Sequence, residues 1–194
     1  MAGNSQRAFR VGVLTFFLSI SISLLFQLTH TGTVYWVSVL VLLLVVFLGI
    51  VFDVIGTATT AASEKPFHAM ARDRVAGAKR AIELVRKADQ VANFCNDVVG
   101  DICGTVSGSI SAALVIDFAV NYNLTSYRDL ISLVVVGLIS ALTVGGKAAG
   151  KSLALKKSSL ILLKVAFILE KIEVLSGRRK EQGKNKKAKI KSER

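Results

Sequence analysis

Long apolar runs alternate with short basic segments along this chain. Residues 11–52 and 130–146 contain no Asp, Glu, Lys or Arg, and residues 102–120 contain Asp117 alone. A helix needs about 20 apolar residues to cross the roughly 30 Å hydrocarbon core of a bilayer. The pattern therefore predicts an all-α polytopic membrane protein. The expected membrane helices are residues 11–29, 34–62, 88–120 and 130–146.

The first apolar run could also be a cleaved signal peptide, because Arg7 and Arg10 precede it. The run is long, no small-residue cleavage site follows it, and a second apolar run begins at once. We therefore predict a retained helix. Residues 1–33 then form an N-terminal membrane helix and a tight turn at 30–33.

Residues 65–87 are helical in pattern but too polar for a membrane span. Pro66 suits the first turn of a helix, and apolar residues recur at helical spacing among basic ones. Gly77 predicts a break, which gives a helical hairpin. Residues 151–175 predict a juxtamembrane amphipathic helix that completes a domain at 34–176. Residues 177–194 hold nine Lys or Arg and two Glu, a net charge of +7, and predict a disordered polybasic tail that binds anionic lipid.

Charge predicts the orientation. The N-terminus, the 65–87 hairpin and the tail hold most of the Lys and Arg, whereas the loops at 30–33 and 121–127 hold none. The positive-inside rule places the basic segments in the cytoplasm, so both termini lie inside and the protein is multi-pass in the cell membrane. The chain is 52% hydrophobic with a net charge of +12. A nucleic-acid-binding protein would carry such charge on a soluble fold, so we expect a lipid bilayer and no nucleic acid as partner.

The segment VGGKAAGKS, residues 144–152, fits the pattern of a nucleotide-binding P-loop. A P-loop must follow a short buried strand within an α/β unit. This segment follows an apolar run of membrane length, so we expect no nucleotide site and no enzyme. We predict instead a small-residue break between a membrane helix and an interfacial helix.

Polar residues interrupt the predicted spans in three places. Asp53 and Thr57 lie in a segment rich in Gly and Thr, where we expect local unwinding. In the third span Asn93, Asp97, Gly100 and Asp101 recur at the spacing of one helix face, and Asn96 lies beside them. Lys147 ends the fourth span.

Gly100, Gly104 and Gly108 form a small-residue stripe that predicts close helix packing, within one chain or between two. The polar residues support two interpretations. Carboxylate and amide oxygens suit a hard cation such as magnesium. They also suit an internal network of ion pairs and hydrogen bonds that locks the helices together.

Three motifs carry a family resemblance: FDVIGTA at residues 52–58, GAKRA at 77–81 and GKAAGKS at 146–152. Their order over roughly residues 45–175 resembles the transmembrane domain of the CNNM/CorC magnesium transporters. That family has F-S-x-S-E-T-A-like, R-A-K-R-A-like and F-G-E-I-x-P-K-S motifs. The resemblance implies magnesium as the transported ion, no other cofactor, and a homodimer.

The departures from the family fall on its chemistry. Asp53 and Ile55 stand where the resemblance implies ion-contacting serines, and Lys147 stands where it implies a glutamate. The CBS domains usual in the family have no counterpart here. Two functions therefore remain open: a cation transporter with a rebuilt site, or a non-transporting scaffold or partner subunit. In the second, Lys147 replaces the cation by pairing with Asp53, Asp97 or Asp101, unless it extends to the cytoplasmic interface.

Overall fold

The structure is a computed structural model that describes residues 9, 12–13, 15–24 and 35–175. Over these residues it is all-helical and shows no strand, which confirms the all-α part of the predicted fold class. The elements are α2 (Tyr35–Ala61), α3 (Glu64–Arg72), α4 (Ala78–Arg86), α5 (Ala88–Ala92), the π-helix η1 (Asn93–Val99), α6 (Gly100–Asn121), the 3₁₀ helix η2 (Thr125–Tyr127), α7 (Arg128–Lys156) and α8 (Ser158–Leu175).

Three helices are long and apolar enough to cross a membrane: Tyr35–Ala61, Ala88–Asn121 and Thr125–Lys156. They correspond to three of the four predicted spans. Of the span predicted at 11–29, the described part contains the shorter apolar helix Thr15–Leu24. The turn predicted at 30–33 and the tail at 177–194 lie outside the described residues.

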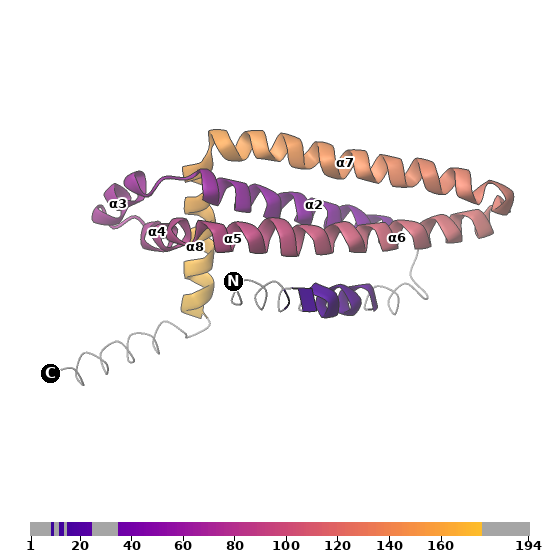
Figure 1. The fold of residues 1–194 in the computed structure, drawn as a ribbon, viewed down its shortest axis with the longest axis horizontal. Coiled ribbons are helices and arrows are strands. Elements are labelled where there is room, and N and C mark those ends of the chain that lie inside the picture. The colour runs from indigo at the N-terminus through magenta and orange to yellow at the C-terminus, as the bar shows by residue number, and fades with distance from the viewer. Residues whose placement is uncertain (1–8, 10–11, 14, 25–34, 176–194) are drawn as a thin grey trace.

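The three long helices lie side by side, with the turn from α6 to α7 at one end (Figure 1). α3 and α4 extend from the opposite end, where α8 crosses the bundle at a steep angle. α2 and α6 form most of the core, which includes Leu42, Val46, Ile102, Val106 and Ile110. α7 covers one side and exposes a largely apolar surface, as expected of a helix that faces lipid.

Two predicted helix interruptions are wrong. α2 is continuous through Asp53 to Ala61, and the hydroxyls of Thr59 and Thr60 donate to the carbonyls of Ile55 and Thr57 within the same helix. Hydroxyl groups at such positions can therefore bond to helical carbonyls without unwinding the helix.

α7 likewise continues through the glycine-rich segment and ends at Lys156, so the predicted interfacial helix is divided between α7 and α8. The glycines are tolerated because they bring α7 against α2. A Cβ atom on Gly150 would stand 2.5 Å from Cγ2 of Val54, and one on Gly146 would overlap Ile50.

α3 and α4 pack against α8 around a cluster of buried apolar residues: Phe67, Ala81, Ile82, Leu162 and Ala166. Gly77, which has a φ of 84°, begins α4 after the turn from α3. Its N–H donates to Glu170 Oε2 at 2.7 Å, and Arg80 pairs with Glu173 of α8 at 2.5 Å. The turn and α8 are thus held together by polar contacts as well as apolar ones.

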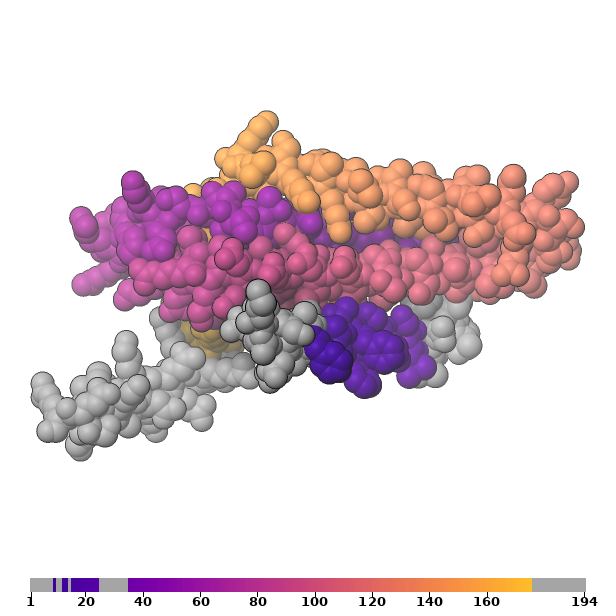
Figure 2. All heavy atoms as spheres, in the orientation of Figure 1, coloured from indigo at the N-terminus to yellow at the C-terminus, as the bar shows by residue number. Residues whose placement is uncertain are grey.

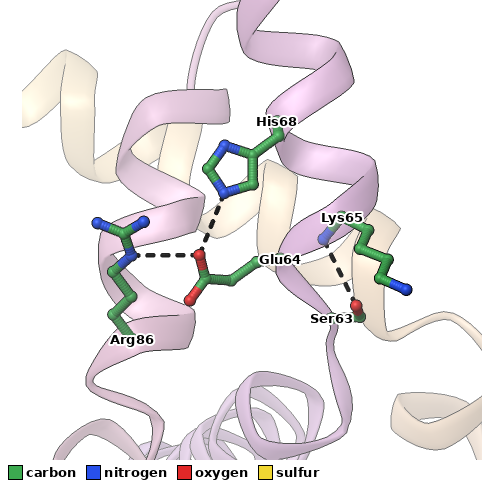
Figure 3. Close-up of polar contacts among 5 residues, drawn as sticks. All are labelled: Ser63, Glu64, Lys65, His68 and Arg86. Atoms are coloured by element: carbon green, nitrogen blue, oxygen red, sulfur yellow. Dashed lines mark hydrogen bonds and ion pairs between the residues drawn. The ribbon is translucent and has the colours of Figure 1, made fainter.

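Glu64, at the start of α3, links α3 to α4 by polar contacts (Figure 3). Its Oε2 atom lies 3.2 Å from His68 Nε2 and accepts a hydrogen bond from Arg86 Nε at 3.2 Å. Nearby, the Ser63 hydroxyl accepts from the Lys65 N–H and caps α3. The contact with His68, followed by that with Arg86, lowers the pKa of Glu64 below its ordinary value of 4.5.

Stability of the α3–α4 contact should therefore fall at acid pH. A carboxyl group with a lowered pKa in the folded state stabilises that state above its ordinary pKa, and this contribution is lost as the pH falls below about 4.5. Hydrogen exchange of α3 and α4 amides between pH 3 and 6 should show this loss. Glu64→Gln should remove that part of the pH dependence, whereas Asp129→Asn at the opposite end of the bundle should retain it. An unchanged profile in Glu64→Gln would contradict the assignment.

Candidate intramembrane polar site

Asp53 is a buried carboxylate inside the helix bundle. It precedes the end of α2 by eight residues, which places it about 12 Å along the helix from that end. It is 4% exposed, and its Oδ2 atom is buried without a hydrogen-bond donor in the described structure. A buried carboxylate oxygen without a hydrogen bond is costly, so this oxygen is best stabilised by a cation or a water molecule nearby.

Asn96 supplies a second buried oxygen. It lies within η1, and its side chain rests directly on Gly56, where the oxygen would overlap any Cβ atom. The Oδ1 atom is also buried without a donor in the part of the chain that the structure describes. Gly56 follows Asp53 by three residues on α2, so these positions lie on the same side of the helix. The two helices therefore bring two acceptors without donors into the same region.

Two lysines of α7 approach this region. Lys151 Nζ lies 3.8 Å from Asp53 Oδ2, although the lysine side chain is 53% exposed and the aspartate side chain 6%. Lys147, one turn earlier, extends toward α6, where its Nζ lies 3.5 Å from the position of a Cβ atom on Gly100. The ion pair with Asp53 is therefore made by Lys151 and not by Lys147, for which the sequence predicts it. The structure shows no ion pair between Lys147 and a carboxylate within the described residues.

The other predicted polar residues do not join this site as a group. Thr57 is half-buried, while Asn93, Asp97 and Asp101 are exposed. Asn93, Asp97 and Asp101 do share a face, but it is an exposed one. Asn96 instead contacts Gly56 of α2 from within the π-helix η1. Short π-helical segments within α-helices occur frequently at functional sites.

The glycine stripe is also arranged differently from the prediction. Cβ atoms on Gly104 and Gly108 would have no neighbour within 4 Å, so within one chain these residues do not form a close helix contact. They line a groove of about 190 Å³ between α6 and α7 together with hydroxyl groups such as those of Ser107 and Thr143. Close contacts to α2 are made at other glycines. At Gly49, for example, a Cβ atom would stand 3.0 Å from Cβ of Cys103.

Asp53 and Asn96 offer one carboxylate and one amide oxygen as possible ligands of a cation. Within the described residues there is no group of three or more His, Cys, Asp or Glu side chains that could hold a metal ion. One carboxylate and one amide oxygen fit an ion such as Mg²⁺ that retains most of its water ligands.

Comparisons with protein-family models, with curated proteins and with solved structures found no match for this chain.

Proposed function

We propose that the protein is an integral membrane protein that binds a small hard cation at Asp53 and Asn96 and conducts it through the helix bundle. The observation that carries the proposal is the pair of buried oxygens without donors, one on α2 and one on η1. A cation bound between them would remove the cost of burying both. Magnesium is the cation class that the family resemblance implies, and the oxygen ligands are compatible with it.

Lys151 provides a way to regulate occupancy. Its side chain is about half exposed at the end of the bundle that carries α3, α4 and α8. When no cation is bound, its ammonium group offsets the charge of Asp53. An entering cation competes for the same carboxylate oxygen, and the long, flexible side chain can move away into water. In binding, the cation then replaces the Lys151 ammonium group as the positive charge beside Asp53.

We propose that the protein crosses the cell membrane several times, with α3, α4, α8 and both termini in the cytoplasm. The basic residues of 65–87 and of α8 lie at one end of the bundle, and the loop between α6 and α7 at the other end is poor in them. The order of α2, α3–α4, the polar helix and α7 is that of the CNNM/CorC-like domain proposed for residues 34–176. A homodimer remains part of the same proposal.

A second function is favoured by the ion pair itself. If the ammonium group of Lys151 neutralises Asp53 permanently, the polar residues lock the bundle and the protein serves as a membrane scaffold or partner subunit. Lys147, one turn away, adds further positive charge against α6. In this function no cation from solution is needed.

Thermal melts with and without magnesium separate the two functions. Millimolar Mg²⁺ should stabilise the wild-type protein by mass action. Lys151→Met removes the charge that competes with the cation. The variant should therefore be stabilised at a roughly tenfold lower Mg²⁺ concentration than the wild type, and a tenfold change in affinity corresponds to about 1.4 kcal/mol. Asp53→Asn should not respond, and Asp129→Asn should behave as wild type.

The outcomes are distinct. A Lys151→Met protein that is destabilised and unresponsive to Mg²⁺ would support the scaffold function, because the buried carboxylate would then lack its counter-ion. A response retained in Asp53→Asn would contradict the proposed site. Uptake of magnesium into proteoliposomes, lost in Asp53→Asn, tests whether binding leads to transport.

A further inference from the structure

A separate apolar pocket lies where α8 crosses the bundle. Its volume is about 500 Å³, and it is lined by three groups of elements: α2, the segment from α4 to η1, and α8. The apolar lining includes Phe52, Ile55, Phe94, Val165 and Ile168. Thr59 at 0% and Cys95 at 6% exposure are its most buried lining residues, whereas Phe94 and Ile168 are exposed. The pocket is therefore a deep recess with an open rim.

One side of the rim of this recess carries positive charge. Lys87 lines it directly and is exposed, and Gln90 lies beside it. The structure gives Lys87 no ion pair within the described residues. On α8, Lys164 and Lys171 precede and follow Ile168 by four and three residues, which places them on the same side of that helix. An apolar recess with a basic rim is complementary to a molecule with an apolar body and an anionic head.

The position of the recess is compatible with a lipid ligand. α8 crosses the three long helices at the end that carries α3 and α4 (Figure 1), and the space-filling view in Figure 2 shows the bundle as an elongated body. In a bundle that spans the bilayer, this corner lies at the boundary between hydrocarbon and headgroups. Lysine ammonium groups at that depth reach the phosphate layer while their methylene stems pack on apolar surface.

We propose that this recess binds one anionic phospholipid, with an acyl chain between α2 and α8 and its phosphate at Lys87. The proposal is independent of the polar site, because Asp53, Asn96 and Lys151 do not line the recess. Bound lipid would connect α8 to α2 through apolar contacts that the protein itself leaves open.

Lipid-dependent melting of the full chain in detergent tests this proposal. Phosphatidylglycerol should raise the melting temperature by about 4 °C, and phosphatidylcholine with the same acyl chains should raise it less. Lys87→Gln should reduce the difference between the two lipids, whereas Lys79→Gln, at an exposed lysine of α4 outside the recess, should leave it unchanged. Ile168→Trp fills the recess and should reduce both lipid effects, whereas Leu160→Trp on the exposed surface of α8 should not. Glycerol phosphate, which has no acyl chain, should have no effect.

Three results would overturn the proposal: equal stabilisation by both lipids, an equal effect of Lys79→Gln and Lys87→Gln, or a full response in Ile168→Trp. Native mass spectrometry provides a second measurement in case Ile168→Trp is unstable. It should detect one retained phosphatidylglycerol per wild-type chain and less than half that occupancy in Lys87→Gln. Equal occupancy would contradict the assigned phosphate position.

Discussion

Replacing Gly77 by alanine is expected to detach α3 and α4 from α8 and to lower the free energy of unfolding by roughly 3 kcal/mol. Two features of this position contribute. The φ of 84° is unfavourable for any residue with a Cβ atom. That Cβ atom would also stand 2.8 Å from the backbone nitrogen of Phe167 and 3.2 Å from the carbonyl oxygen of Leu163, neither of which can rotate away.

Gly77→Ala should also weaken the hydrogen bond that the residue 77 N–H donates to Glu170 of α8. A fall in melting temperature of about 10 °C corresponds to the expected change in a chain of this size. Gly104→Ala is the matched control: Gly104 is helical, exposed and without a neighbour for its Cβ atom, so alanine should be neutral or stabilising by up to about 1 kcal/mol. Similar melts for both variants would show that Gly77 does not make this contact.

Gly146→Leu is expected to separate α7 from α2, with a cost of roughly 3 kcal/mol from overpacking. A Cβ atom alone would already overlap Ile50 of α2, and leucine adds three further carbon atoms. The displacement should also disturb Gly150, one turn later, and the ion pair between Lys151 and Asp53. If the proposed magnesium site exists, the stabilisation by magnesium should therefore weaken together with thermal stability.

The adjacent Gly145 is an internal control for this experiment. A Cβ atom there has no neighbour within 4 Å, and the residue is exposed. Gly145→Leu adds the same side chain at almost the same depth, so it should melt like the wild type. Equal destabilisation by the two variants would show that contact with α2 is not what excludes leucine at Gly146, because leucine has a higher helix propensity than glycine at both positions.

The long helices could be predicted from the sequence because each carries an uninterrupted apolar run. The continuity of α7 could not be predicted: Gly146 and Gly150 read as a break until their contacts with Ile50 and Val54 are known. Tertiary packing here outweighs the poor helix propensity of glycine.

The candidate site was predicted in part. Asp53, which the sequence indicates as a polar residue of the site, is buried in α2, and the side chain of Asn96 contacts Gly56 of the same helix. Lys151 was missed because a sequence places Lys147 and Lys151 on one helix face without showing which of them reaches Asp53. The sequence places Asp97 and Asp101 on one helix face but does not show that this face is exposed, and the hydrophobic pattern contains no signal for η1.

η1 also determines the angle about the helix axis between α5, which precedes it, and α6, which follows it, in the helix from Ala88 to Asn121. In an α-helix each residue turns the chain by about 100°, so deleting one residue to restore regular hydrogen bonding would rotate the preceding turns by about that angle. Lys87 and α5 would then swing around the helix axis relative to α6. The seven π-helical residues thus fix the angle at which α5 and the residues before it stand relative to α6.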